Sequence, residues 1–189
     1  LSNSVKFSVK YNKSFTEAYI NSEFIPIPMR DSILEFAVAP GVVSAYGGNA
    51  TEKDLKIKIS VPGMYNYFKI SDVRSSVIRN HKFEPEHILI VTTTAGARTE
   101  EVARHLKVWV LPKDNPFYSS KEEVERWDST GEVDKKVRKK MEPLNLEMIP
   151  SEFENSKMHS FRYKPEVGRW LFIEIQKGLK SFGDYVLAD

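Results

Sequence analysis

The amino-acid sequence predicts an α+β protein whose N-terminal part is rich in antiparallel strands, arranged as one sheet or as a sandwich. Apolar and polar residues alternate in several short segments, and Pro and Gly separate these segments at intervals of about ten residues. Near residue 87 the pattern changes to a small strand–helix–strand unit, and a charged helical insertion follows it. We expect a single domain over residues 1–189, with residues 112–150 as a charged, partly helical excursion.

The strands of the N-terminal part are predicted by alternation along the chain. Phe7, Val9 and Tyr11 alternate with polar residues, with the period of two that is typical of a half-buried strand. Pro26 and Pro28 cannot donate to a strand ladder, so they are expected at a sheet edge or in an extended connection. Strand-forming composition recurs in four more segments, at residues 15–20, 34–38, 42–46 and 55–61.

The strand–helix–strand unit is predicted in the middle of the chain. Residues 87–91 are apolar on both faces, which is typical of a strand that is buried on two sides. Thr99 can cap a helix that runs to Leu106, and acidic residues fill the first turn of that helix. Residues 108–111 then form the second strand.

Two short helices are predicted inside the charged excursion. Ser120 and Glu123 have the spacing of a capping box, so a helix is expected over residues 120–127. A second helix is expected over residues 134–141. The C-terminal segment 169–182 fits either a strand or a helix, and its β-branched and aromatic residues favour a strand.

The composition excludes several classes of function. The chain carries 28 basic and 26 acidic residues, so its net charge of +2 gives no long-range field of the kind that nucleic-acid-binding proteins use. It contains no cysteine, which excludes disulfides, thiolate catalysis and cysteine-ligated zinc. The sequence motifs of serine hydrolases, zinc proteases, P-loop proteins and dinucleotide-binding proteins are absent, and the spacing of the four histidines matches no metal site. We therefore expect no catalytic residue, no metal and no cofactor.

The compartment is predicted from hydropathy and from the start of the sequence. The apolar runs are shorter than the roughly 20 residues that a membrane helix needs, so no membrane span is expected. The chain begins at Leu1 without an initiating Met, as it would after removal of an export signal or after excision from a longer polypeptide. We expect an extracytoplasmic protein, and a cytoplasmic location stays the alternative.

A candidate ligand site lies in the 92–99 loop expected between the buried strand and the helix. Its predicted ligand-binding residues are Thr94, Gly96, Arg98 and Thr99. Backbone N–H groups at a helix N-terminus favour anions, and an arginine can form two parallel hydrogen bonds to a phosphate or carboxylate. In the alternative interpretation Gly96 makes a turn, Thr99 caps the helix and Arg98 is solvated.

The strongest local charge feature is a basic patch. It consists of Lys135, Lys136, Arg138, Lys139 and Lys140. Such a run can contact phosphates of nucleic acid or lipid, but aromatic residues that would stack on bases are missing from it. Because acidic residues flank the run, we expect a solvated helix face rather than a nucleic-acid site.

Aromatic residues in predicted turns are candidates for binding a protein partner. They are Tyr65 and Tyr67, which follow a Pro-Gly turn, and Phe117 and Tyr118, which follow Pro116. Aromatic side chains on turns anchor protein partners or sugar rings, and they also fold back to cover a sheet. The sequence leaves both interpretations open.

Taken together, these features predict a non-enzymatic binding or structural component of a cell envelope or of a larger protein assembly. A protein is the expected partner, because the sequence offers turn aromatics but no convergent set of catalytic side chains. The alternative is an enzyme or a small-molecule binder that holds an anionic group at the 92–99 loop.

Overall fold

The computed structural model describes residues 4–118, 126–164, 166 and 168–188. It is mostly β, with 41% strand and 8% helix, and it contains several small antiparallel sheets and two short helices. The helical share is thus smaller than an α+β class implies. The chain divides into two compact units, Leu1–Met64 (unit 1) and Tyr65–Asp189 (unit 2). The units are described separately below, and the expectation of a single domain stays a prediction.

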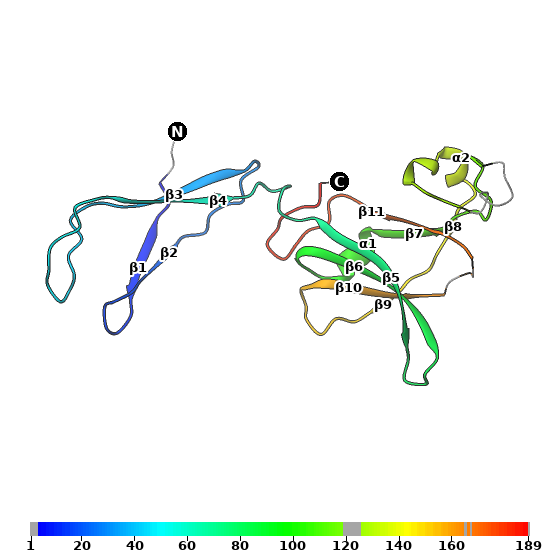
Figure 1. Ribbon diagram of the computed structural model, residues 1–189, viewed down its shortest axis with the longest axis horizontal. Coiled ribbons are helices and arrows are strands. Elements are labelled where there is room, and N and C mark those ends of the chain that lie inside the picture. The colour runs from blue at the N-terminus through cyan, green and yellow to red at the C-terminus, as the bar shows by residue number, and fades with distance from the viewer. Residues whose placement is uncertain (1–3, 119–125, 165, 167, 189) are drawn as a thin grey trace. The chain divides into compact units, whose positions relative to one another are not determined.

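Unit 1 consists of two β-hairpins (Figure 1). Three of the predicted strands are confirmed, and the strand expected at residues 15–20 is shifted to residues 18–22. The strand expected at residues 42–46 is wrong, because Gly41 and Gly47 take positive φ angles of 97° and 85° and fold this segment into a loop. The first hairpin pairs β1 (Phe7–Tyr11) with β2 (Ala18–Ser22), and the second pairs β3 (Ser32–Val38) with β4 (Leu55–Val61).

Unit 2 is built from two antiparallel sheets, which Figure 1 shows as two layers. The four-stranded sheet has the order β5 (Ile70–Arg79), β6 (Pro85–Ala97), β10 (Ser156–Tyr163), β9 (Glu147–Ile149). The three-stranded sheet has the order β11 (Leu171–Ile175), β7 (Leu106–Val110), β8 (Glu142–Pro143). Helix α1 (Thr99–His105) joins β6 to β7 and so carries the chain from one sheet to the other.

The predicted strand–helix–strand unit is confirmed, with two corrections. The buried strand continues through Ala97, so residues 92–97 belong to β6 and are not a loop. The N-cap of α1 is Arg98 rather than Thr99, and no side chain caps it. Strand pairing with β10 extends β6 beyond the apolar run, because backbone ladder bonds do not depend on side-chain polarity.

Strands β5 and β10 are missing from the sequence prediction, because polar residues occupy inward positions in both. In β5 the inward Ser75 forms a hydrogen bond of 2.6 Å with the Tyr163 hydroxyl. In β10 the buried His159 precedes the buried Phe161 on the same face. Each polar residue interrupts the apolar period that would have identified its strand.

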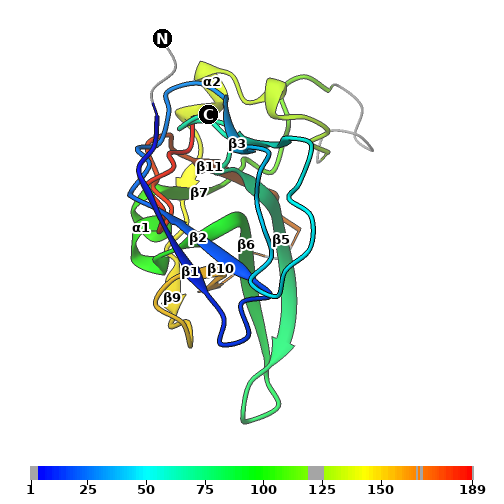
Figure 2. The same cartoon turned by 90° about the vertical axis from the view of Figure 1, so that its left-hand side faces the viewer.

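The main core of unit 2 lies between its two sheets. Leu89 and Val91 of β6 and Phe161 of β10 are 0–1% exposed, and Val102 of α1 and Val108 of β7 pack against them. A sheet that is apolar on one face has to cover that face, and the second sheet and α1 do so here. Figure 2 shows the β5–β6 hairpin extending beyond the sheet that it belongs to.

The charged excursion shares a small second core with Leu111 and with Phe172 of β11. Leu111, Trp127, Val133, Val137 and Phe172 are buried together. Its described helices are a 3₁₀ turn, Thr130–Glu132, and α2, Lys135–Arg138, which is shorter than the predicted helix. The excursion also contains β8 and β9, and the helix predicted at residues 120–127 lies largely outside the described residues.

The C-terminal segment forms strand β11, as its composition favours. In the part of the chain that the structure describes, no helix has the length and the apolar character needed to cross a membrane.

Candidate functional site

The predicted ligand site at residues 92–99 is occupied by structural contacts. The Thr94 hydroxyl donates to the carbonyl of Tyr67 at 2.8 Å and accepts the N–H of Lys69 at 3.0 Å. A Cβ added to Gly96 would lie 3.1 Å from the Asn155 carbonyl oxygen, so glycine lets the two backbones approach closely, and a larger residue would require the Asn155 backbone to shift by a few tenths of an ångström. These contacts explain the presence of Thr94 and Gly96 at these positions without a ligand.

Arg98 and Thr99 have different surroundings. The Arg98 guanidinium is exposed, pairs with Glu154, and lines a cavity of about 480 Å³ together with Lys180 and Ser181. The Thr99 side chain is buried and lies 3.1 Å from Nδ1 of His159. The cavity thus contains Arg98 but is not lined by Thr94 or Thr99.

His159 is the buried titratable group of this region. It is 1% exposed, and burial lowers the pKa of its imidazole below 6.5 because the charged form loses its hydration. Among the described residues, no group forms a hydrogen bond with its Nε2. A neutral imidazole held by Thr99 in the core stabilises the packing of α1 against β10, and it is closed to substrate.

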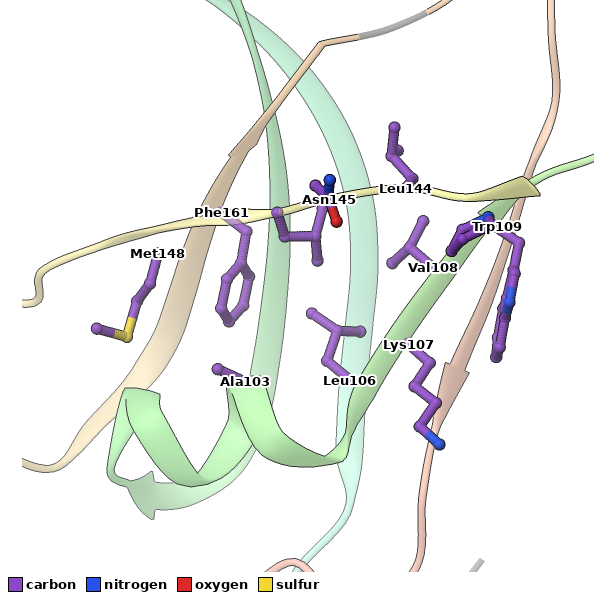
Figure 3. A pocket seen from close by; sticks show the side chains of 11 residues that line it. Ala103, Leu106, Lys107, Val108, Trp109, Leu144, Asn145, Met148 and Phe161 are labelled. Carbon is purple, nitrogen blue, oxygen red and sulfur yellow. The ribbon is translucent and has the colours of Figure 1, made fainter.

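An apolar cleft lies between α1, β7 and residues 143–148 (Figure 3). Its volume is about 330 Å³, and it opens onto the main core at Phe161, Leu106 and Val108. The polar side chains in its lining are Lys107 and Asn145. The cleft offers mainly apolar packing surface, and Lys107 is the one ionisable side chain among the described residues that line it. Alternation of apolar residues over 144–148 is the sequence signal that could have located it.

A second cleft, which we call the α2 cleft, lies between α2 and the turn that carries Phe117. It has a volume of about 510 Å³. Its apolar lining comes from Pro112, Pro116, Phe117 and Val137. Its charged lining comes from Lys136, Lys139, Lys140, Asp114 and Asp134. The α2 cleft therefore joins one predicted partner-binding aromatic residue to three residues of the predicted basic patch.

The basic patch is divided between two surroundings. Lys136, Lys139 and Lys140 line the α2 cleft, whereas Lys135 is not part of its lining. Arg138 contacts Glu174 at 3.2 Å and lies 5.1 Å from the centre of the Phe172 ring. Arg138 is thus bound to β11, and the three lysines of the cleft are exposed charges at its lining.

The charge of the α2 cleft is set by its three lysines. The Asp134 carboxylate accepts the backbone N–H groups of Lys136 and Val137, both at 2.8 Å, and so caps α2. Asp114 is the second acidic residue of the lining. Three positive and two negative side chains leave the lining positive, and one of the two carboxylates is already occupied by the helix cap.

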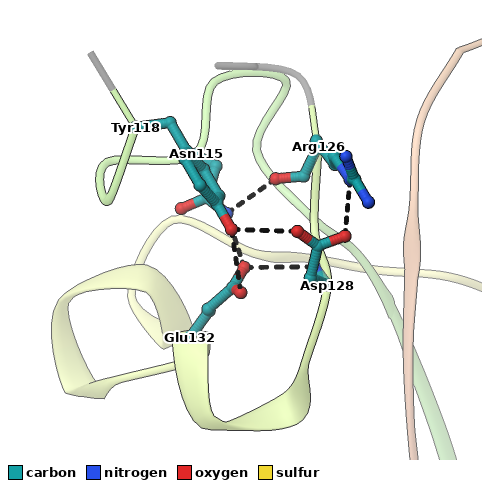
Figure 4. A network of polar contacts seen from close by, with 5 residues as sticks. All are labelled: Asn115, Tyr118, Arg126, Asp128 and Glu132. Carbon is teal, nitrogen blue, oxygen red and sulfur yellow. Dashed lines mark hydrogen bonds and ion pairs between the residues drawn. The ribbon is translucent and has the colours of Figure 1, made fainter. Parts of the chain in front are cut away.

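A polar network holds the turn of Phe117 in place (Figure 4). Asn115 is fully buried and donates through Nδ2 to the Arg126 carbonyl and to the Glu132 carboxylate, both at 2.7 Å. The Tyr118 hydroxyl donates to Asp128 at 3.0 Å, and this bond raises the pKa of Tyr118. These hydrogen bonds hold the turn against residues 126–132, and a turn held before binding loses less entropy when a partner binds.

The Asp128 carboxylate is the charged centre of this network. Arg126 contacts it at 2.6 Å. This hydrogen bond, followed by the one from Tyr118, lowers the pKa of Asp128. Asp128 therefore stays ionised under neutral conditions and keeps the Tyr118 hydroxyl in place as a donor.

The other two predicted aromatic residues lie before β5. The Tyr67 ring is 4.7 Å from the Tyr185 ring, so it covers part of the C-terminal segment. Tyr65 is exposed. Sequence reasoning missed a further exposed aromatic residue, Phe83, at the tip of the β5–β6 hairpin. In the described part of the chain, no group of three or more His, Cys, Asp or Glu side chains could hold a metal ion.

Comparison with known proteins finds similarity to bacterial alpha-2-macroglobulins. No family model matches the chain, and no solved structure matches it significantly. An alpha-2-macroglobulin of Rickettsia conorii is 26% identical over 201 residues, which cover 96% of this chain and 11% of the relative. An alpha-2-macroglobulin homolog of Yersinia pestis is 22% identical over 191 residues, covering 98% of this chain and 9% of the relative.

An alpha-2-macroglobulin of Pasteurella multocida is 23% identical over 184 residues, covering 96% of this chain and 9% of the relative. The chain spans between 9% and 11% of the length of these curated relatives. It is therefore similar, over nearly its whole length, to one segment of much longer bacterial alpha-2-macroglobulins.

Proposed function

We propose that the chain is a non-enzymatic structural segment of a longer alpha-2-macroglobulin-like protein of the bacterial cell envelope. The observation that carries the proposal is the extent of the match. The alignments include 96–98% of this chain but only 9–11% of each relative. A match of this kind supports the proposal that this chain is one structural segment of a much longer polypeptide. The same likeness supports the extracytoplasmic location that we expect from the sequence.

The structure supports a non-enzymatic role through what its polar residues do. The hydroxyl of Thr99 and the imidazole of His159 face each other in the core, and Thr94 bonds two backbone groups. Catalysis needs such groups at a surface that a substrate reaches. Thr99 and His159 are buried away from such a surface, and the hydroxyl of the exposed Thr94 is engaged by two backbone groups.

An immunoblot of fractionated cells tests this proposal. With an antibody raised against the 189-residue chain, we expect a band several times heavier than 21.7 kDa in the envelope fraction. A band at 21.7 kDa in the cytoplasmic fraction would overturn two parts of the proposal: that the chain belongs to a longer polypeptide, and that it lies in the cell envelope.

The partner that we propose is a protein, bound at the α2 cleft, and the likeness to alpha-2-macroglobulins makes a protease the first candidate. The cleft combines an exposed aromatic side chain, Phe117, with three lysines on a support that is fixed by buried hydrogen bonds. An aromatic anchor surrounded by charge is typical of a binding surface. The positive lining favours an acidic segment of the partner.

Reversing one charge in the α2 cleft is expected to weaken this binding. Lys139→Glu should reduce the affinity for an acidic partner at least about tenfold, because like charges then face each other. The matched control is Lys135→Glu, which makes the same change outside the lining of the cleft. Binding of a fluorescent Glu-rich peptide with one Phe, measured by anisotropy, checks this, and equal losses in both variants would contradict a role of the cleft.

Anion binding at Arg98 is the second candidate function. The observation that favours it is a cavity lined by two basic residues, Arg98 and Lys180, and one acidic residue, Glu101. Arg98→Ala should abolish thermal stabilisation by phosphate. It should change the stability of the free protein by less than about 1 kcal/mol, because the Arg98–Glu154 pair is exposed. Phosphate stabilisation that persists in Arg98→Ala would remove this candidate.

A further inference from the structure

The hairpin formed by β5 and β6 continues beyond the rest of its sheet. The last ladder pair between β6 and β10 joins His87 to Tyr163, whereas β5 and β6 stay paired as far as Arg79 and Pro85. Residues 77–86, which we call the hairpin tip, therefore lie at or beyond the end of β10, and Figure 1 and Figure 2 show the hairpin projecting from unit 2. Strand β5 has 10 residues, which rise about 33 Å, so the tip is far from the start of unit 2.

The hairpin tip exposes apolar side chains on both faces and in its turn. Val77 is 56% exposed and Ile78 is 42% exposed. They are consecutive residues of one strand, so their side chains point to opposite faces. Phe83, in the turn that joins the two strands, is 77% exposed. The apolar surface of the tip is therefore not restricted to the face that covers the core of unit 2.

The backbone of the turn holds the Phe83 ring in its exposed position. Phe83 has a φ angle of 64°, a left-handed conformation that is uncommon for a bulky residue. Oδ1 of Asn80 maintains the turn, because it accepts the N–H groups of Lys82 at 2.8 Å and of Glu84 at 3.0 Å. The Phe83 N–H donates to the Asn80 carbonyl at 2.9 Å. A strained residue that the surrounding contacts keep in place is typical of a functional site.

The charges of the hairpin tip favour an anionic partner. Glu86 pairs with Arg162 at 2.9 Å, so these two charges cancel. Arg79 and Lys82 are exposed, and no carboxylate of the described residues forms an ion pair with either. Glu84 carries the other negative charge, which leaves the tip with an excess of one positive charge. Cations beside an exposed aromatic ring complement the headgroup region of an anionic membrane.

Apolar side chains on two opposite faces favour a membrane over a protein partner. A flat protein surface covers one face of a hairpin and leaves the other in water, whereas the fluid interfacial region of a bilayer covers both faces at once. We infer that the hairpin tip inserts into the interfacial region of a bilayer that contains anionic phospholipid. Val77, Ile78 and Phe83 then lie among the upper parts of the acyl chains, and Arg79 and Lys82 lie at the phosphates. The inference rests on the envelope location in the proposed function, which places the chain beside membranes.

Flotation of the 189-residue chain with lipid vesicles tests this inference. The vesicles contain phosphatidylglycerol and phosphatidylethanolamine. Phe83→Asn removes the ring and keeps the turn, because asparagine accepts positive φ angles. It should reduce the partition coefficient at least about tenfold, since the buried ring supplies much of the binding.

The matched control is Phe153→Asn, which removes a ring that is 70% exposed elsewhere in unit 2 and should leave binding unchanged. All other exposed apolar residues are the same in the two variants, so their difference reports on the tip. Equal losses in both variants, or no binding of the unchanged chain, would overturn the inference.

Charge reversal tests the anionic lipid. Lys82→Glu should weaken vesicle binding at least about fivefold, because it replaces attraction to the phosphates by repulsion. Lys135→Glu makes the same change in net charge outside the tip and should have a smaller effect. Vesicles of phosphatidylcholine alone should bind the unchanged chain less. Equal losses in the two variants, or equal binding to both kinds of vesicle, would overturn the inference.

A tryptophan at the tip distinguishes insertion from adsorption at the membrane surface. In Phe83→Trp, brominated acyl chains should quench more fluorescence than in Phe153→Trp, and the three native tryptophans contribute equally to both variants. Equal quenching would overturn the inference. A dimer that forms without lipid and that Phe83→Asn abolishes would identify a second copy as the partner, which also overturns it. A heavy envelope band on the immunoblot without vesicle binding overturns this inference alone, whereas a cytoplasmic 21.7-kDa band overturns the proposed function.

Discussion

Phe161→Ala is expected to lower the free energy of unfolding of unit 2 by about 3–5 kcal/mol, which is the usual cost of removing a buried aromatic ring. Phe161 is 1% exposed and lies in the main core with Leu89, Val91 and Val108. Its ring also lines the apolar cleft beside α1, so the cavity that the variant leaves would merge with an existing one. Urea denaturation followed by Trp fluorescence measures the change.

Met158→Ala is the matched control for Phe161→Ala, because both residues are on β10. Met158 is 54% exposed, so its loss should change the free energy of unfolding by less than about 0.5 kcal/mol. If the two variants are destabilised equally, the inward face of β10 is not the one that holds the core.

The stability of unit 2 is expected to fall as the pH is lowered below 6.5, and His159 is the cause. Burial lowers the pKa of His159 in the folded state, so the folded protein keeps a neutral imidazole while the unfolded chain takes up a proton. The stabilisation is therefore fully present above pH 6.5. It decreases by up to about 1.4 kcal/mol per pH unit until the pKa of the folded state is reached.

Comparison with His159→Gln isolates this contribution. Glutamine has no proton to gain in this range, so the difference in unfolding free energy between the two proteins should depend on pH below 6.5 and be constant above it. Urea denaturation at several pH values between 4.5 and 8 provides the measurement. Parallel pH dependences of the two proteins would show that His159 is protonated equally in the folded and the unfolded chain.

Local patterns in the sequence determine much of the strand content. Alternation identifies β1, β3 and β4, an apolar run identifies the middle of β6, and composition favours the strand found in β11. These predictions succeed because the period of two is a property of neighbouring residues and needs no knowledge of what the strand faces. The same local reasoning fails at residues 42–46, where positive φ angles at Gly41 and Gly47 form a loop.

Only the tertiary structure decides which of the candidate residues meet. Phe117 and Lys139 are distant in sequence, yet they line one cleft, whereas Arg98 and Thr99 are neighbours whose side chains have different surroundings. The registers of the strands and the packing of the two sheets fix these relations, and they depend on contacts between residues far apart in the chain. Sequence therefore determines which face of each strand is apolar, and the fold determines what covers that face: a second sheet and α1 in unit 2, and no buried core in the described part of unit 1.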